Sequence, residues 1–246
     1  MSTAIVSRAT GRVVELTLNR PDVGNALDLE MVDALLDALD GIDPTACDTI
    51  VLRGEGKGFC GGLNLAGLDE ESDATLFWRL TRIELLLQKM AAMPQQTVAL
   101  AHRFAFGAGA DLFAACRLRI AAPGTKFAFP GVRFGIALGT GRLVRRVGPD
   151  AARAMLATTA PITLEHALAT GLAQQETAVE AWSAMIAELA TATSSLDARM
   201  AGIVAERLNP GEDGADMAAL VRSAAEPGLK DRIAAYAAAV AAARKR

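Results

Sequence analysis

The sequence predicts an α/β fold with a helical C-terminal region, because strand-like and helical segments alternate before Pro149 and helical segments follow it. Apolar runs typical of buried strands occupy Val13–Leu18, Thr49–Leu52 and Thr97–Ala101. The second and third runs each lead into a loop of small residues. Because such loops leave backbone N–H groups free, a ligand site is expected where these strands end.

The expected elements of the first third begin with the strand over 13–18, which a turn at Pro21 ends. Asp28 then caps a helix, which ends at Gly41. Its apolar side chains fall on one stripe at helical spacing: Leu29, Val32, Leu35, Leu36 and Leu39. After the strand at 49–52, a helix is predicted over 74–93, closed by Pro94.

The elements that follow Thr97–Ala101 are shorter. A helix is expected over 112–116, and short strands are expected over 118–121 and 126–129. Ala-rich helical segments then continue to the end, at 150–158, 163–169, 181–192, 196–208, 214–224 and 228–243. Asn209–Gly214 is read as a turn between two of these helices.

Composition and charge narrow the classes of function. The chain has 246 residues, 52% hydrophobic, a net charge of -3 and a pI near 5.5, which indicates a soluble globular protein without general attraction to nucleic acid. Cys47, Cys60 and Cys116 lack Cys-x-x-Cys spacing, so neither a disulfide framework nor a metal site is expected. No run approaches the roughly 18 apolar residues of a membrane span, and the polar N-terminus lacks a leader pattern. We therefore expect a cytoplasmic protein with no membrane partner.

Two loops carry the strongest functional signal. Phe104–Asp111 reads Phe-Ala-Phe-Gly-Ala-Gly-Ala-Asp, and Phe59–Asn64 reads Phe-Cys-Gly-Gly-Leu-Asn. At the start of a helix, free N–H groups and the positive end of the helix dipole form an anion site. Two backbone donors that converge on one developing oxyanion indicate acyl or enolate chemistry.

Three other functions for these loops are disfavoured. A dinucleotide-binding turn lacks its third glycine, because Leu112 occupies that place. A phosphate-binding P-loop is excluded because Gly58 follows Lys57 where Ser or Thr is required. The Gly-x-Ser-x-Gly pattern of a nucleophile elbow is absent, and only two histidines exist that could serve as the base. A hydrolytic triad is therefore not expected.

Several blocks along nearly the full length resemble the crotonase superfamily, the enoyl-CoA hydratase and isomerase fold. In order, they are residues 18–27, 50–65, 105–111, 128–135 and 171–173. The resemblance implies a crotonase-like ββα-spiral core over residues 1–190. It implies a C-terminal helical region over 191–246 that serves in trimerisation or as a lid, and a homotrimer or a dimer of trimers.

The resemblance also implies roles for single residues. The N–H groups of Leu63 and Ala108 are expected to form an oxyanion hole for the thioester oxygen of an acyl-CoA, and Asp111 is expected to be the acid or base. The residues expected to contact substrate are Asn25, Ala26, Cys60, Gly61, Gly62, Asn64, Gly107, Pro130 and Gly131. Neither a metal nor a separate cofactor is implied, since coenzyme A enters as part of the substrate.

Departures from the family pattern bear on the reaction. Family hydratases use two glutamates, and the corresponding positions here are Asp111 and Gly131. Loss of a methylene withdraws a carboxylate by roughly 1 Å, and misplacement of this size costs about a hundredfold in rate. Hydration is therefore disfavoured, whereas a 1,3-proton shift needs one carboxylate. Family isomerases usually keep that acid at the position of Gly131. A second interpretation of Asp111 therefore stays open, in which it stabilises the start of a helix and takes no part in catalysis.

Other residues could supply a base. His102 stands where the family commonly has Asn; we favour a structural, hydrogen-bonded role, although its titration range would suit a base. Glu70 or Glu71 could substitute for the missing acid, but a solvated acidic loop is the simpler interpretation.

The function predicted from the sequence is an acyl-CoA-binding enzyme of enoyl-CoA hydratase/isomerase type, active in acyl-CoA or fatty acid metabolism. One alternative is a catalytically impaired family member that binds acyl-CoA. Another is a decarboxylase or thioesterase on the same scaffold, since one fold hosts many reactions. The acyl group is not specified by these motifs.

Overall fold

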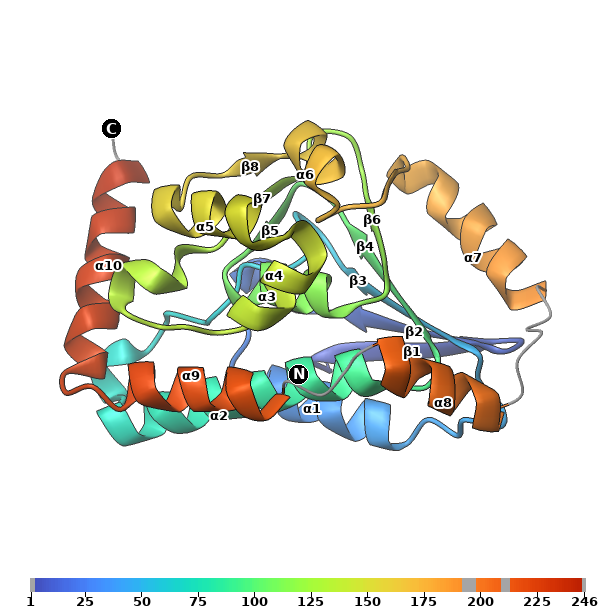
Figure 1. The fold of residues 1–246 in the computed structure, drawn as a ribbon, viewed down its shortest axis with the longest axis horizontal. Coiled ribbons are helices and arrows are strands. Elements are labelled where there is room, and N and C mark those ends of the chain that lie inside the picture. Colours follow the sequence, from blue (N-terminus) through green and yellow to red (C-terminus); the bar gives the residue numbers. More distant parts are fainter. Residues whose placement is uncertain (1–2, 192–197, 209–212, 245–246) are drawn as a thin grey trace.

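The computed structural model describes residues 3–191, 198–208 and 213–244, which are coloured in Figure 1. Two sheets organise these residues, with strand orders β1-β2-β3-β4-β6-β9 and β5-β7-β8. The strands of the larger sheet are β1 (Ile5–Thr10), β2 (Val13–Leu18), β3 (Thr49–Gly54), β4 (Gln96–Ala101), β6 (Leu118–Ala121) and β9 (Gln175–Glu176). Those of the smaller sheet are β5 (Phe104–Phe106), β7 (Lys126–Ala128) and β8 (Ile162–Thr163).

Parallel pairing brings the functional loops to one edge of the larger sheet. β1 and β2 are antiparallel, whereas β2, β3, β4, β6 and β9 run parallel. Arg53 near the end of β3 pairs with Leu100 near the end of β4, so the two strands finish side by side. The loops that follow them therefore leave the sheet together.

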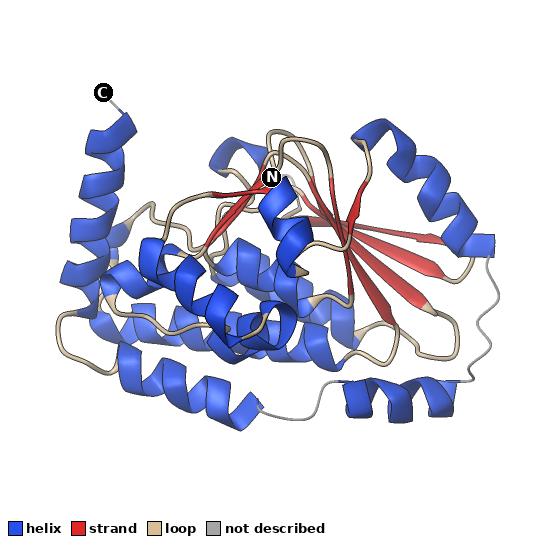
Figure 2. Ribbon diagram, turned by 45° about the horizontal axis from the view of Figure 1, so that its top comes forward, coloured by secondary structure: helices blue, strands red, loops and turns tan. Residues whose placement is uncertain are grey.

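Alternating side chains bury both faces of this sheet. Leu16, Ile50 and Leu52 belong to the main core with residues of α1 (Leu29–Asp40) and α2 (Asp73–Ala92). Val13, Val51 and Val98 pack instead with Trp182 at the start of α7 (Trp182–Thr191). Helices thus cover the sheet on both faces, and Figure 2 shows the twisted sheet between them.

The other helices lie around the second sheet and along α2. They are α3 (Ala108–Ala115), α4 (Thr140–Val147), α5 (Pro149–Thr158), α6 (Leu164–Thr170), α8 (Ala198–Leu208), α9 (Asp213–Ala224) and α10 (Leu229–Arg244). Short 3-10 turns are η1 (Pro21–Val23), η2 (Leu68–Glu70), η3 (Pro130–Phe134) and η4 (Val179–Ala181). A satellite core joins α2 to α9, α10 and η3: Leu76, Leu80, Phe134, Ile136, Leu220, Ala224, Leu229 and Ile233. The end of the chain therefore folds back onto the core (Figure 1).

Most of the predicted elements are confirmed. β2 has the predicted bounds, and α1 begins after Asp28, whose carboxylate accepts the N–H of Met31 at 3.0 Å. The α/β class and the helical C-terminal region are also as expected. The boundary at 190/191 stays a prediction, since it adjoins residues 192–197, outside the described part. The turn predicted at 209–214 also falls largely outside it, at 209–212.

The short strands β5, β8 and β9 were not predicted from the sequence, and β1 and α4 were also missed. β1 is an edge strand whose side chains are mostly exposed, with Val6 45% exposed, so it lacks the apolar run that predicts a strand. α4 carries arginines at positions that face the interior, and its Arg142 is buried. Hydrophobic periodicity cannot detect a helix that buries charge. No helix in the described ranges is long and apolar enough to cross a membrane.

Candidate active site

Asn25 organises the loop after β3. Its side-chain amide lies near three carbonyl oxygens, those of Glu55 at 2.9 Å, Gly58 at 3.0 Å and Phe59 at 3.2 Å. Its Oδ1 accepts the N–H of Arg20 at 2.9 Å, and its backbone has a positive φ of 54°. The side chain is fully buried, so it satisfies carbonyl groups that would otherwise be buried without a donor.

Cys60 continues this support. Its thiol donates to the carbonyl of Asn25 at 3.1 Å, and burial raises its pKa to about 12. A thiol in this state is not a nucleophile at neutral pH. The next residue, Gly61, donates its N–H to the carbonyl of Gly24 at 2.9 Å. Cys60 therefore has a packing role.

The second loop lies directly against the first. Phe106 N–H donates to the carbonyl of Cys60 at 3.0 Å, and Gly107 N–H donates to Ala128 at 2.8 Å. A Cβ on Gly109 would lie 2.4 Å from the carbonyl oxygen of Cys60. The closeness of the two backbones thus requires glycine at this position.

Gly62 also lies close to the start of α3. Its φ is +88°, and a Cβ there would lie 2.5 Å from the carbonyl oxygen of Phe106 and 3.2 Å from the backbone nitrogen of Ala108. The neighbouring amide of Leu63 and that of Ala108 donate no hydrogen bond to any described residue. Two unused donors therefore lie on adjacent loops, one of them at the positive end of the α3 dipole.

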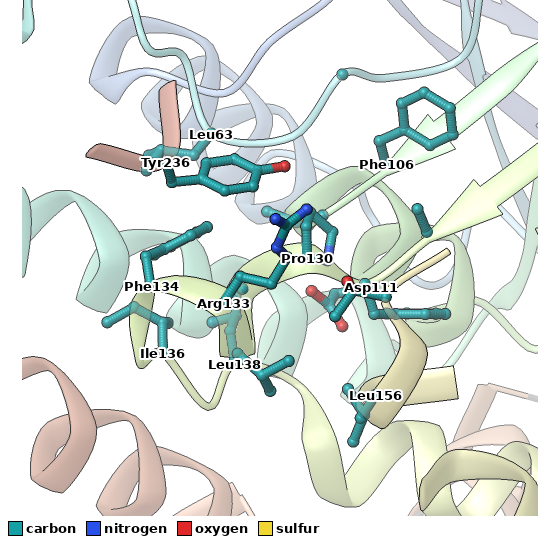
Figure 3. Close-up of a pocket in the computed structure, with 18 of the residues that line it drawn as sticks. Leu63, Phe106, Asp111, Pro130, Arg133, Phe134, Ile136, Leu138, Leu156 and Tyr236 are labelled. Atoms are coloured by element: carbon teal, nitrogen blue, oxygen red, sulfur yellow. The ribbon is translucent and has the colours of Figure 1, made fainter. Parts of the chain in front are cut away.

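Both amides belong to residues that line one cavity of about 360 Å³. The same cavity is lined by Asp111 of α3 and by Pro130 and Gly131 of η3, as Figure 3 shows in part. Apolar side chains make up most of the remaining wall: Leu65, Leu80, Phe106, Phe134, Ile136, Leu138, Leu143, Leu156 and Val240. A pocket of this kind suits a ligand with one polar group and an apolar chain.

Asp111 is the acidic residue of this wall. Its side chain is 6% exposed, and a Cβ on Gly139 would lie 2.7 Å from its Oδ1. Burial raises its pKa well above the usual carboxyl value; the charge of Arg142 opposes this shift, while Glu84 and Asp216 add to it. Asp111 therefore keeps its proton to higher pH than an exposed aspartate does.

A buried charge network lies behind Asp111. Arg142 of α4 pairs with Glu84 of α2 at 2.5 Å and with Asp216 of α9 at 3.4 Å. Asp216 also accepts the backbone N–H of Gly141 at 2.9 Å. The network joins three helices and places two further carboxylates near Asp111, which accounts for part of its raised pKa.

Gly131 faces the same cavity without a side chain. Its carbonyl accepts the N–H of Ile136 at 3.0 Å, and a Cβ at this position would lie 3.2 Å from the carbonyl oxygen of Ile136. The turn is therefore tight but not closed to a side chain. Asp111 is the single carboxylate among the described residues that line the cavity.

Comparison with known proteins shows the family of the chain. Residues 8–212 match the enoyl-CoA hydratase/isomerase family. The chain belongs to this family. A probable enoyl-CoA hydratase, echA6 of Mycobacterium tuberculosis, is 36% identical over 184 residues, which cover 72% of this chain and 74% of that protein.

Solved structures of family proteins share the fold. A putative enoyl-CoA hydratase/isomerase from Bordetella parapertussis superimposes with a TM-score of 0.93 at 38% identity, over 96% of this chain and 99% of that one. An enoyl-CoA hydratase from Bacillus halodurans has a TM-score of 0.82 at 23% identity, over 94% and 99% of the two chains. The crotonase-type fold predicted from the motifs is confirmed.

Within this family fold, the residues predicted for the site fall into two groups. Those that line the cavity are Gly61, Leu63, Gly107, Ala108, Asp111, Pro130 and Gly131. Those that lie outside its lining are Asn25, Ala26, Cys60, Gly62 and Asn64. Asn64 donates to Asp28 at 3.0 Å and accepts the N–H of Ala66 at 3.0 Å. Asn25, Cys60 and Asn64 of the second group therefore hold the loop at 59–64 through hydrogen bonds outside the cavity.

The alternative bases predicted from the sequence lie outside the cavity lining. His102 places Nε2 2.9 Å from the carbonyl oxygen of Gly56, and its ring packs edge-on against Trp182. Glu71 pairs with the buried Arg79 at 2.5 Å, and Glu70 is exposed on η2. None of the three side chains lines the cavity that contains Asp111.

Arg133 and Tyr236 were missed as pocket residues. Arg133 follows Gly131 by two positions, and Tyr236 is the single tyrosine of the chain, within the Ala-rich α10. The lone aromatic hydroxyl in that helix was a usable signal for Tyr236. Its contact with η3 depends on how α10 folds back, which local patterns do not encode. Among the described residues, no group of His, Cys, Asp and Glu could hold a metal ion.

Proposed function

We propose that the protein binds an acyl-CoA thioester and stabilises its enolate through the N–H groups of Leu63 and Ala108. The supporting observation is that both amides lack an acceptor among the described residues and line one cavity with Asp111. Loss of one such donor typically costs about 3–4 kcal/mol in transition-state stabilisation. These donors would supply the largest share of the catalysis.

Asp111 would carry the proton. In a 1,3-proton shift, its carboxylate removes a proton from the α-carbon of a 3-enoyl thioester, and the electron pair moves onto the thioester oxygen as a dienolate. The resulting carboxylic acid then protonates the γ-carbon, which leaves a 2-enoyl thioester and restores the carboxylate. Since burial raises the pKa of Asp111, its ionised form is a stronger base toward a C–H group than an exposed aspartate.

This reaction class suits the acidic wall better than hydration does. Addition of water by the family mechanism uses two glutamates, and Gly131 provides no carboxylate. One acid can perform both halves of a proton shift. Coenzyme A would enter as part of the substrate, with no metal and no separate cofactor.

The test compares crotonyl-CoA hydration with isomerisation of a 3-enoyl-CoA, in the wild type and in Asp111→Asn. We expect wild-type isomerisation and a loss of about 10²–10⁴-fold in the variant, with acyl-CoA binding nearly unchanged. Asp150→Asn, at an exposed position on α5, is the matched control and should retain turnover. Wild-type hydration faster than isomerisation would contradict the proposal.

Gly131 also motivates a second candidate, a family member that binds acyl-CoA without turnover. Tight binding of acyl-CoA with no product from a broad acyl panel would establish it. Release of CO₂ or of free coenzyme A in the same panel would instead show a decarboxylase or a thioesterase. Each outcome differs from the isomerisation that we expect.

A homotrimer or a dimer of trimers is part of the proposal, as is a cytoplasmic location. The Ala-rich C-terminal helices present small side chains that allow close packing between helices. Light scattering should give three or six times the 25.6 kDa mass of the chain. A monodisperse monomer would contradict this assembly.

A further inference from the structure

Arg133 gives the apolar pocket an isolated positive charge. It is the single basic residue among the described residues that line the cavity, and its guanidinium extends into the space near Pro130 and Tyr236 in Figure 3. The side chains around this end are Phe134, Ile136 and Leu138. Arg133 is itself exposed, so its charge lies at the rim of this apolar wall.

No described carboxylate neutralises Arg133. It forms no ion pair with any described residue, in contrast to Arg79 and Arg142, which pair with Glu71 and Glu84. The charges that act on Asp111 are those of Arg142, Glu84 and Asp216, so Arg133 is not the counter-ion of Asp111. The guanidinium is therefore available to an anionic group of a ligand.

The guanidinium of Arg133 packs against an aromatic pair. It lies 5.7 Å from the centre of the Tyr236 ring, and that ring packs on Phe134 at 4.9 Å. Arg232 of α10 donates to the carbonyl of Phe134 at 3.0 Å and thereby fixes η3. A Cβ on Gly135 would lie 2.4 Å from Nη1 of Arg232, so the turn must carry glycine here. This contact with the Tyr236 ring favours one orientation of the guanidinium over the pocket.

Arg133 also lies where the pocket meets the surface. Arg133, Phe134 and Tyr236 line both the main cavity and a neighbouring surface hollow, and Arg133 is exposed overall. An anion bound there keeps contact with water, so it avoids the desolvation penalty of a fully buried ion pair. The enclosed part of the pocket remains apolar.

We infer that the acyl chain of the substrate carries a carboxylate at its far end, and that Arg133 binds this carboxylate. The inference rests on the proposed function, since the thioester must first sit at Leu63 and Ala108. Phe134, Ile136 and Leu138 suit the methylene groups of an acyl chain, whereas the pantetheine arm and phosphates of coenzyme A need polar partners. A planar guanidinium matches a carboxylate through two parallel hydrogen bonds. The substrate class is a dicarboxylic acid monothioester of coenzyme A.

Binding of matched thioester pairs tests the inference. Calorimetry would measure the binding of three pairs of thioesters, each with equal chain length and with or without a terminal carboxylate. The pairs are succinyl-CoA and butyryl-CoA, adipyl-CoA and hexanoyl-CoA, and suberyl-CoA and octanoyl-CoA. We expect the carboxylated member of at least one pair to bind about tenfold more tightly at low salt, with a smaller preference at high salt. Arg133→Gln should abolish the preference and Arg133→Lys should retain part of it, while Arg8→Gln on the exposed β1 should leave it unchanged.

The outcomes separate this inference from the proposed function. Binding of hexanoyl-CoA by wild type and by Arg133→Gln supports the acyl-CoA site whatever happens with the carboxylated thioesters. No preference for a carboxylate in any pair overturns the inference. Equal weakening of both members and of free coenzyme A by Arg133→Gln would place a coenzyme phosphate at Arg133, which also overturns it.

Discussion

The two walls of the pocket are built by different means. The wall formed by residues 59–64 and 105–109 presents backbone amides, and its geometry depends on glycines that let two loops touch. The wall that carries Asp111 depends on side chains and on a buried charge network. Backbone donors tolerate many side-chain changes, whereas proton transfer depends on the identity of a few side chains. We therefore expect the first wall to be shared across the scaffold and the second wall to determine the reaction.

The largest expected effect concerns the charge network of the acidic wall. Arg142→Met would leave Glu84 and Asp216 buried without their shared cation, which should lower the free energy of unfolding by about 3–5 kcal/mol. Urea denaturation would measure this loss. Arg12→Met removes the exposed pair with Asp48 and serves as control, with little change expected. Equal losses in the two variants would show that the network does not stabilise this wall.

The wall of backbone donors is tested by Gly62→Ala. The added Cβ would lie 2.5 Å from the carbonyl of Phe106, so the loops must separate and the two amides diverge. We expect turnover to fall by about 10²–10³-fold, the loss seen when one donor of this type is removed. Steady-state kinetics would measure it.

Gly67→Ala is the matched control for backbone strain. Gly67 also has a positive φ, of +70°, but a Cβ there meets no atom within 4 Å. Both variants carry a similar conformational penalty, of about 1 kcal/mol. If turnover falls as much in Gly67→Ala as in Gly62→Ala, backbone strain explains the loss and the separation of the two amides does not.

The incomplete acidic wall is tested by Gly131→Glu. Its Cβ would lie 3.2 Å from the carbonyl of Ile136, so a shift of a few tenths of an ångström should accommodate it at about 1 kcal/mol of stability. We expect hydration of crotonyl-CoA to increase about tenfold or more, because a second carboxylate can then activate water. The measurement is the loss of enoyl absorbance. Gly131→Gln has the same size without the charge, and an equal gain there would refute this explanation.

The smallest effect is a pH dependence of stability. The folded-state pKa of Asp111 lies above that of the unfolded chain, so ionisation destabilises the fold increasingly as pH rises above the ordinary carboxyl value of about 3.9. Asp111→Asn should therefore raise Tm relative to wild type, and more at pH 8 than at pH 5. A difference that shrinks between pH 5 and pH 8 would contradict the raised pKa.

Local patterns in the sequence predicted much of this molecule. Apolar periodicity located β2, α1 and α2, and capping residues such as Asp28 set their ends. Small residues at 59–64 and 105–109 predicted two loops that carry amides, and the structure brings these loops together. The signals worked because each is contained in a few consecutive residues.

Features that depend on distant contacts were not predictable in this way. Hydrophobic periodicity did not predict α4, because this helix buries the charged Arg142. The carboxylate partners of Arg142 come from α2 and α9. Tyr236 reaches the pocket because α10 folds back over η3, and Arg133 acquires its position from this packing. Asn25, which was expected to contact the substrate, also donates to the carbonyl groups of Glu55 and Gly58, which are distant in sequence.

The central claim is that Leu63 and Ala108 hold the thioester oxygen while Asp111 faces the carbon chain. A crystal structure with a non-hydrolysable enoyl-CoA analogue tests it most directly. The account predicts the carbonyl oxygen of the analogue within about 3 Å of both backbone nitrogens, and a carboxylate oxygen of Asp111 near the α- or γ-carbon. A carbonyl oxygen bound away from the two amides, or an acyl chain outside the cavity, would contradict it.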